Sequence, residues 1–481
     1  MDLSASDVFL TLFGGVSGGL ASPWLGVGWL VYVAVLAAWI VRQRRDPVST
    51  LAWLLVLAWL PVIGWAVYWW LGPQRIKRRS LKRLRARLAL AEAQLPSVGK
   101  EVEDDQERLL EAATGYGPTC ATRITLLTGG ERTFEALFDA ISKATQSIHL
   151  EYYIFEPDGV GTRLRDILVE RARAGVEVRL LLDGMGGRRC SKRFLAPLRE
   201  AGGEVGWFHP LKLAHIIWRP TLNLRTHRKI AVIDSTIGFT GGVNISDVQS
   251  ERASAAAFHD LHLQLEGEIV RALQLAFAED WNYCTGKKLA DERYWAPLAR
   301  GDIRCQLVPS GPDNPLAPIH RLMVDAVHRA RQRVWIMTPY FVPDPAMLLA
   351  ITSAGLRGLD VRILLPARSD SVIVRAAARS FYPELLAAGV DVFEFKPRML
   401  HGKALLVDDD IAVIGSANVD PRSFFLNFEL SIRVRNVEVA KALAKRIEAD
   451  LKQSEPVARG WRPYGLQAYT DSAARLMSPL L

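Results

Sequence analysis

The stretch His401-Gly402-Lys403-Ala404-Leu405-Leu406-Val407-Asp408 has a counterpart upstream, His227-Arg228-Lys229-Ile230-Ala231-Val232-Ile233-Asp234. Both read His-x-Lys-x4-Asp, and each is followed by an apolar run, a turn of small residues and an asparagine. These tails end in Gly241-Gly242-Val243-Asn244 and Gly415-Ser416-Ala417-Asn418. The chain has only 9 His in 481 residues, so two such matches with matching tails are not expected by chance. We interpret them as a duplicated functional motif rather than as two core strands that each happen to carry a histidine.

The residue types of the motif suit chemistry on a phosphodiester. Side chains alternate faces along an extended strand, so the histidine and the lysine of each motif point the same way. An imidazole beside an ammonium group and an Asn amide supplies a nucleophile together with donors for the non-bridging phosphate oxygens. Two copies supply two histidines, so one can attack phosphorus while the other protonates the departing alcohol.

The two aspartates are expected to play a different part. Each lies seven residues after its histidine, and this odd separation puts it on the other side of a regular strand. We therefore predict that the aspartates support the site rather than react. The predicted catalytic set comprises His227, Lys229, Asp234, His401, Lys403 and Asp408, with Asn244, Asn418 and Ser416 as supporting residues.

The duplicated motif resembles the signature of the phospholipase D superfamily. That resemblance implies a covalent phosphohistidine intermediate, no metal or other cofactor, and a carboxylate about thirty residues after each histidine that orients the imidazole. Asp260 and Glu429 stand at those places. His259 and His262 beside Asp260 could form a metal pair, but no cysteine or carboxylate cluster completes such a site. We expect both to be strand histidines.

The chain repeats itself from Thr122 onward. Three pairs of matching segments begin 186, 183 and 187 residues apart: 148–158 with 334–344, 175–179 with 358–362, and 201–205 with 388–392. The offset falls to 174 at the histidines, so the first half has an extra segment, roughly 211–224. Short β-branched strands alternate with helical stretches in each half. We predict an α/β fold of two similar lobes, each a mixed sheet flanked by helices, related by a pseudo-twofold that brings the histidines into one cleft.

The charge of the chain is concentrated at one end. Net charge is +9, but residues 1–100 carry +8 of it. The remainder is nearly neutral, which argues against nucleic acid as a partner. The four cysteines are scattered with no C-x-x-C pair, which favours reduced structural thiols over a disulfide framework or a zinc site.

The N-terminal segment is predicted to be a transmembrane hairpin. Apolar runs at about 24–41 and 51–71 are long enough to span a bilayer, with tryptophans near their ends. A cleaved signal peptide is the alternative for the first run, but no Lys or Arg precedes it. Residues 74–95 are predicted to form a basic amphipathic helix at the membrane surface, with an ordinary solvated helix as the alternative, and 96–117 to be a linker. Eight basic residues after the second run favour a cytoplasmic location for the lobes.

The whole chain also resembles bacterial cardiolipin synthases of the phospholipase D type. The resemblance covers the flanks of the second apolar run, His149-Leu150-Glu151-Tyr152-Tyr153, residues 258–267 and the closing Ser-Pro-Leu-Leu. It implies that two phosphatidylglycerols yield cardiolipin and glycerol at the bacterial inner membrane. One departure is Phe258-His259-Asp260, where the family is expected to have Trp-Arg-Asp more often, and this leaves local substrate contacts open.

The predicted domain boundaries follow from these assignments. We expect a membrane hairpin at 1–73, the basic helix and linker at 74–120, the first lobe at 121–290, and the second lobe with a helical tail at 291–481. Alternatives to the synthase are a phospholipase D-type hydrolase or transferase that uses water or another headgroup lipid as acceptor, and a membrane scaffold with inactive lobes. The second lipid substrate and the attacking histidine stay open, although the resemblance favours His227.

Overall fold

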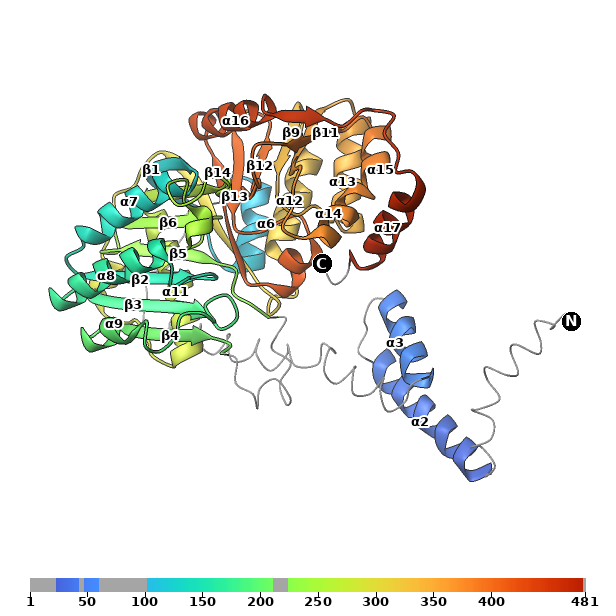
Figure 1. Ribbon diagram of the computed structural model, residues 1–481, viewed down its shortest axis with the longest axis horizontal. Coiled ribbons are helices and arrows are strands. Elements are labelled where there is room, and N and C mark those ends of the chain that lie inside the picture. Colours follow the sequence, from blue (N-terminus) through green and yellow to red (C-terminus); the bar gives the residue numbers. More distant parts are fainter. Residues whose placement is uncertain (1–22, 43–46, 60–101, 211–223, 479–481) are drawn as a thin grey trace, which may run out of the picture. The chain divides into compact units, whose positions relative to one another are not determined.

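The chain forms two compact units, residues 1–75 and 76–481, in the computed structural model (Figure 1). The structure describes residues 23–42, 47–59, 102–210 and 224–478. In the first unit, α2 (Pro23–Val41) and α3 (Pro47–Trp59) pack together around Ile40 and Leu57. Within the described ranges, no helix has both the length and the apolar character needed to cross a bilayer.

Several predicted segments lie outside the described residues. These are the residues of the predicted hairpin before 23, from 43 to 46 and from 60 onward, which include the end of the second span at 60–71. The basic helix at 74–95, residues 96–101 of the linker and all but the last residue of the extra segment at 211–224 also lie outside. The predicted transmembrane hairpin therefore stays a prediction.

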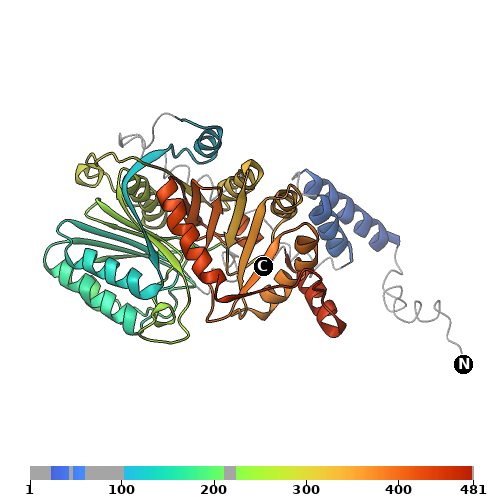
Figure 2. The same ribbon diagram turned by 90° about the horizontal axis from the view of Figure 1, so that it is seen from above.

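The second unit is built on a single sheet whose two halves have the same strand order. Among the described residues the sheet has 15 strands in the order β15-β11-β10-β9-β12-β13-β14-β8-β1-β7-β6-β5-β2-β3-β4. Read outward from the centre, β1-β7-β6-β5-β2-β3-β4 matches β8-β14-β13-β12-β9-β10-β11 strand for strand. The prediction of a mixed α/β fold is confirmed. Figure 2 shows the strands of the two halves as parts of one sheet.

The strands of the first half are β1 (Thr119–Thr128), β2 (Ser147–Tyr152), β3 (Glu177–Asp183), β4 (Glu204–Phe208), β5 (Lys229–Ile233), β6 (Ile237–Gly241) and β7 (Leu261–Gly267). Those of the second half are β8 (Ile303–Ser310), β9 (Arg333–Met337), β10 (Asp360–Pro366), β11 (Asp391–Phe395), β12 (Ala404–Val407), β13 (Ile411–Gly415), β14 (Glu429–Arg435) and the edge strand β15 (Ser454–Pro456). The halves meet where β1 and β8 pair antiparallel, from Thr119 opposite Cys305 to Ala121 opposite Ile303.

Helices cover both faces of the sheet. The longer ones are α7 (Gly130–Ser142), α8 (Gly159–Arg173), α11 (Ile269–Thr285), α12 (Pro318–Arg329), α13 (Pro345–Leu356), α16 (Val437–Leu451) and α17 (Gly465–Leu476). Shorter ones are α9 (Ala196–Glu200), α14 (Val372–Arg379), α15 (Tyr382–Ala387), the 3-10 turns η2 (Asp247–Gln249) and η3 (Glu292–Trp295), and the π-helical turn η4 (Arg422–Leu426).

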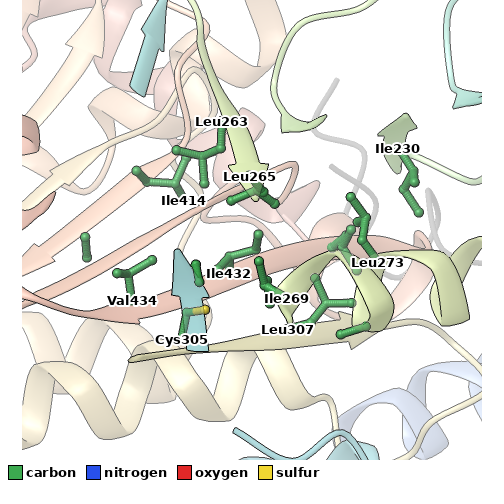
Figure 3. Packing of buried hydrophobic residues seen from close by; sticks show 14 of the residues in the cluster. Ile230, Leu263, Leu265, Ile269, Leu273, Cys305, Leu307, Ile414, Ile432 and Val434 are labelled. Carbon is green, nitrogen blue, oxygen red and sulfur yellow. The ribbon is translucent and has the colours of Figure 1, made fainter. Parts of the chain in front are cut away.

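One hydrophobic core continues across both halves. Residues of α11 and α16 belong to one cluster with strand residues of both repeats. Figure 3 shows part of this cluster, where side chains of the two repeats come together. Ile230, Leu263 and Leu273 of the first half belong to the same cluster as Leu307, Ile414 and Ile432 of the second. Because apolar burial is the main favourable term in folding, this shared core fixes the two halves relative to each other.

Part of the predicted linker at 96–117 is an ordered helix, α6 (Asp105–Thr114). Asp104 caps its start by accepting a hydrogen bond from the Glu107 amide, and Gly115 ends it in the left-handed conformation. The buried Glu107 carboxylate accepts two 2.6 Å hydrogen bonds from Arg304 on β8 and lies 3.3 Å from Arg433 on β14. The linker prediction is wrong here because these long-range ion pairs cannot be read from local composition.

Candidate active site

The predicted site residues gather at one edge of the sheet. β2, β6, β9 and β13 end at this edge, while β5 and β12 begin there, which places a histidine at the start of each motif strand. A cavity of about 820 Å³ opens at the edge, and both halves contribute to its wall. Its lining includes His227, His401, Asn244, Asn418, Tyr153, Tyr340, Arg189, Arg422, Asp370, Asp420 and Asn427.

Each histidine pairs with a carboxylate from the other half. His227 Nδ1 lies 3.0 Å from Glu429 Oε2, and His401 Nδ1 is hydrogen bonded to Asp260 Oδ2. Both carboxylates are fully buried. The family resemblance implied Asp260 and Glu429 as the carboxylates that orient the histidines, but the spacing does not reveal that Asp260, which follows His227, contacts His401. The crossed arrangement makes the two halves a single site.

Backbone pairing between the halves explains the crossing. Thr226 forms a parallel bridge with Phe428, so the residue before His227 lies beside the residue before Glu429. The His227 amide donates to Phe428 O at 2.8 Å. Symmetrically, His259 bridges Leu400, which brings Asp260 beside His401.

Small residues in the turns after β6 and β13 leave room for the carboxylates. Ser416 Oγ donates a 2.5 Å hydrogen bond to Glu429 Oε2, and Asn427 Nδ2 donates to Glu429 Oε1. Gly242 occupies the equivalent place beside Asp260, where a Cβ would lie only 1.9 Å from Asp260 Oδ1. The first turn therefore requires glycine, and the second uses a serine to orient the longer carboxylate.

The hydrogen bonds fix the tautomers of both imidazoles. A carboxylate can only accept, so Nδ1 of each ring carries the proton and Nε2 keeps its lone pair. Burial lowers the pKa of His227 to about 4, although Glu429 acts in the opposite direction. Burial, followed by the charge of Lys403, also lowers the pKa of His401, against the effect of Asp260. Both rings are thus neutral near pH 7 in the free protein.

The two motif lysines are buried next to their histidines. Lys229 Nζ donates to His227 O at 2.6 Å, and Lys403 Nζ lies 2.8 Å from His401 Nδ1. Burial lowers the pKa of Lys229 to about 7 and that of Lys403 to about 8. Both ammonium groups therefore lose their charge far more easily than a lysine in water, and an anion beside them would stabilise the charged form.

Asp234 and Asp408 lie at the opposite ends of the motif strands from the histidines. Asp408 accepts hydrogen bonds from the amides of residues 331, 332 and 333, just before β9. Asp234 does the same for residues 145, 146 and 147, just before β2. The backbone φ is positive at both residues, 49° at Asp234 and 51° at Asp408. Their contacts are those of supporting residues that hold the start of a neighbouring strand.

Asn244 and Asn418, which were predicted to be supporting residues, line the cavity in equivalent positions. The Asn244 side-chain Oδ1 accepts a 3.2 Å hydrogen bond from the backbone N–H of Ile154. The backbone N–H of Asn418 donates a 3.1 Å hydrogen bond to Ser423 Oγ. Both histidines are buried: His262 lies on β7 as predicted, whereas His259 lies two residues before that strand, in the isolated bridge to Leu400. His259 stacks on Phe395 and its Nε2 lies 3.0 Å from Asp450. In the described part of the chain, no group of three or more His, Cys, Asp and Glu side chains is placed to hold a metal ion.

Two tyrosines of the cavity were not singled out from the sequence. The ring of Tyr153 meets the ring of His227 edge-on at 5.0 Å, and the Tyr340 hydroxyl donates to Asp370 at 2.8 Å. Both follow a strand of the repeat, β2 or β9, whose end reaches the edge where the histidines lie. A tyrosine shortly after the corresponding strand of each repeat is the sequence feature from which both could have been predicted. Two cations, Arg189 and Arg422, were missed for lack of any motif.

A duplicated α/β half, with a His, a Lys and a partner carboxylate from each copy, defines a protein of the phospholipase D-like class. The family model described as "Cardiolipin synthase, PLD-like domain" matches residues 137–281 and 323–451, and the model "Phospholipase_D-nuclease N-terminal" matches 29–73. The chain belongs to the phospholipase D-like cardiolipin synthase family.

Individual relatives agree with this assignment. The chain is 40% identical to a cardiolipin synthase of Geobacillus sp. (strain WCH70), covering 93% of this chain and 92% of the relative. It is 37% identical to a cardiolipin synthase of Alkalihalophilus pseudofirmus, covering 97% and 96%. Among solved structures, phosphatidylserine synthase of Haemophilus influenzae superposes with a TM-score of 0.61 at 14% identity, covering 79% of this chain and all of that one. That last likeness concerns the fold alone.

Proposed function

We propose that this chain is a phosphatidyltransferase that joins two phosphatidylglycerol molecules into cardiolipin and releases glycerol. The observation that carries the proposal is the pair of crossed imidazole–carboxylate contacts in one cavity. Relatives of nearly equal length that are named cardiolipin synthases support the choice of reaction. The proposal further specifies that phosphatidylglycerol is both the donor and the acceptor of the phosphatidyl group.

The first step forms a phosphohistidine. The Nε2 lone pair of His227 attacks the phosphorus of one phosphatidylglycerol, and the P–O bond to its glycerol breaks. His401 gives its Nε2 proton to the departing glycerol oxygen. His401 must first be protonated, and the bound phosphate favours this because a nearby negative charge raises the pKa of an imidazole. Glu429 keeps His227 in the attacking tautomer and stabilises the positive charge that develops on the ring.

The second step reverses the first with another alcohol. The glycerol hydroxyl of a second phosphatidylglycerol gives its proton to His401 and attacks phosphorus. The P–N bond to His227 breaks and cardiolipin leaves. One phosphodiester forms for each one that breaks, so the reaction is reversible.

The remaining site residues stabilise charge. Lys229 and Lys403 supply positive charge next to the reacting phosphoryl group, and Asn244 and Asn418 supply amide donors to its oxygens. Losing one such donor typically costs about 3 kcal/mol of barrier. With these groups the transfer requires no metal ion or other cofactor.

The membrane arrangement is part of the same proposal. The match of residues 29–73 to an N-terminal family segment supports a hairpin anchor at 1–73, followed by a basic helix and the α6 region up to 120. The lobes at 121–290 and 291–481 lie on the cytoplasmic side of the bacterial inner membrane. The excess of basic residues after the second apolar run favours this orientation.

Purified protein given phosphatidylglycerol in detergent micelles tests the reaction. Glycerol and cardiolipin should appear in near-equal amounts, and added glycerol should drive cardiolipin back to phosphatidylglycerol. Phosphatidic acid as the main product, insensitive to glycerol, would instead make the protein a hydrolase. His227→Ala and His401→Ala should each abolish turnover, while Leu349→Ala on the exposed face of α13 serves as a control.

A further inference from the structure

Exposed apolar side chains gather around the mouth of the active-site cavity. Val248 lines the cavity and is half exposed. Val372 and Ile373 lie between the lining residues Ser371 and Val374 at the start of α14, and Val372 is 82% exposed. Single exposed apolar residues are common, but several gathered beside one cavity are typical of a surface that binds a partner or a membrane.

A third segment adds to this rim. Phe425 is exposed within the π-helical turn η4, between Arg422 and Asn427, which both line the cavity. A π-helical turn is rare, and such turns are frequent at functional sites. The rim therefore receives apolar residues from both repeats, from the loop after β6 and from two segments of the second half.

α17 carries an apolar stripe on its outer face. Leu466, Tyr469 and Leu476 follow one another at helical spacing and are 77% to 84% exposed. The opposite face is buried against α14, where Asp471 accepts a 2.7 Å hydrogen bond from Arg379. Figure 1 shows α17 beside α14, the helix that carries the rim residues. The usual pattern of an amphipathic helix is inverted here, with the large apolar residues outside.

The charges near the stripe select among possible occupants. From 457 to 478 the chain has three arginines, Arg459, Arg462 and Arg475, and one acid, the buried and paired Asp471. Arg459 and Arg475 each lie near one exposed carboxylate, so the positive excess is modest. An apolar stripe with basic neighbours suits an anionic lipid leaflet. A second copy presenting the same surface would bring like charges together.

We propose that Val248, Val372, Ile373, Phe425 and the outer face of α17 form a docking surface for an anionic lipid leaflet. The inference rests on the proposed function. A diacyl lipid must bring its phosphate to His227 while its acyl chains stay in an apolar medium, and a docked rim lets the headgroup enter the cavity without exposing the chains to water. Docking by this surface adds to any anchoring by the N-terminal segment.

Fluorescent labels in the full-length protein test the contact directly. Single cysteines replace Val372, Phe425, Leu466 or Leu476 in a Cys284→Ser background, since Cys120, Cys190 and Cys305 are buried. Leu349→Cys and Leu356→Cys on α13, 63% and 74% exposed, are the controls. In nanodiscs containing phosphatidylglycerol, quenching by brominated lipid should be at least about threefold stronger at the four test sites than at the controls.

Two results of the label experiment would overturn the inference. One is equal quenching at test and control sites. The other is cross-linking of a test-site cysteine to a second copy or to residues 1–75 in lipid-free protein, because that partner would then cover the surface. These labels report contact without turnover, so they decide the docking question even if no phosphatidyl transfer is found and the proposed function fails.

A kinetic comparison gives a second, independent test. The triple variant Leu466→Ser, Tyr469→Ser and Leu476→Ser should lower turnover of vesicle phosphatidylglycerol at limiting lipid by about tenfold. Its turnover of soluble short-chain phosphatidylglycerol should equal that of the unaltered protein. Leu349→Ser with Leu356→Ser should leave both rates unchanged. Unaltered vesicle turnover in the triple variant, or an equal loss on both substrates, would contradict docking by α17.

Discussion

The two histidines are held by contacts that run between the halves of the molecule. His227 depends on Glu429 for its tautomer, and His401 depends on Asp260. A carboxylate mutation should therefore affect the histidine of the other repeat. This dependence can be measured residue by residue.

Glu429→Gln should lower kcat by about a hundredfold, because an amide no longer stabilises the charge that develops on His227. Because the carboxylate acts through that ring, Glu429→Gln should slow formation of the phosphohistidine on His227 and leave lipid binding nearly unchanged. Single-turnover rates and trapping of the phosphohistidine on the 227 imidazole would measure this. Asn436→Asp, at the half-buried N-cap of α16, is a control for a change of carboxylate content elsewhere in the fold. An unchanged rate of phosphohistidine formation in Glu429→Gln would show that Glu429 does not act through His227.

Lipid affinity should fall as pH rises through about 7 to 8. Lys229 and Lys403 have lowered pKa values near these two numbers, so each carries a positive charge only below its own value. A phosphate anion prefers the charged form, so binding above this range must take up protons. KM for phosphatidylglycerol measured from pH 5 to 9 checks the direction, and proton uptake on binding at pH 8 checks its origin.

Lys403→Arg is the matched variant for this effect. A guanidinium stays charged throughout the range, so the rise in KM above pH 7 should become shallower even where the altered geometry lowers kcat. A KM that is independent of pH in the unaltered protein would contradict the assignment of lowered lysine pKa values to substrate binding.

At the scale of elements, the duplicated strands and turns are where the sequence was most informative. The regular offsets between the halves predicted equivalent strands, and the period-two spacing predicted which side chains share a face. The crossing of Asp260 and Glu429 could not be predicted, because it depends on the Thr226–Phe428 and His259–Leu400 bridges between distant segments. The helix α6 was missed for the same reason, since its stability lies in contacts with β8 and β14.

Asp408→Ala should destabilise the fold while leaving kcat per folded molecule nearly unchanged. Three amides before β9 lose their acceptor, and alanine tolerates the left-handed backbone at this position less well, for a total of about 2 kcal/mol. Urea unfolding followed by circular dichroism measures the loss. Asp409→Ala, the exposed neighbour, is the control. Full stability with lost turnover would make Asp408 a reacting group instead.

Glu107→Gln should cost about 3 to 5 kcal/mol of unfolding free energy. It removes the buried carboxylate between Arg304 and Arg433, which keep only the more exposed partners Glu103 and Asp104. Burial alone would raise the pKa of Glu107, but hydrogen bonds from Arg304 outweigh it and the pKa is lowered. The stabilisation is therefore present above the unfolded value of about 4.3 and is lost as pH falls through the lower folded value.

Thermal unfolding at pH 7 and pH 3 measures the loss of stability in Glu107→Gln and how that loss depends on pH. The difference between Glu107→Gln and the unaltered protein should shrink at the lower pH. Asp105→Asn on the exposed side of α6 should have little effect at either pH. A variant as stable as the unaltered protein would mean that α6 is not held by this ion-pair network.

At the scale of the whole molecule, neither half contains a complete catalytic pair. Residues 1–290 and 291–481 expressed separately should each be inactive, whereas their co-expression should restore transfer, because the shared core and the β1–β8 pairing can reassemble. Co-purification and cardiolipin formation are the measurements. The co-expressed pair carrying His227→Ala is the negative control, and full activity of one fragment alone would contradict the requirement for both halves.

The crossed pairs also set the moment at which the protein becomes reactive. When only the first half of the chain has folded, His227 still lacks its partner Glu429. Asp260 likewise lacks its partner His401. Under the proposed function, the substrates of the finished site are phosphodiesters of the bilayer to which such an intermediate would be anchored. Both imidazole–carboxylate pairs are complete only once β14, which carries Glu429, has joined the sheet, so under the proposed function transfer cannot begin before the second half has folded.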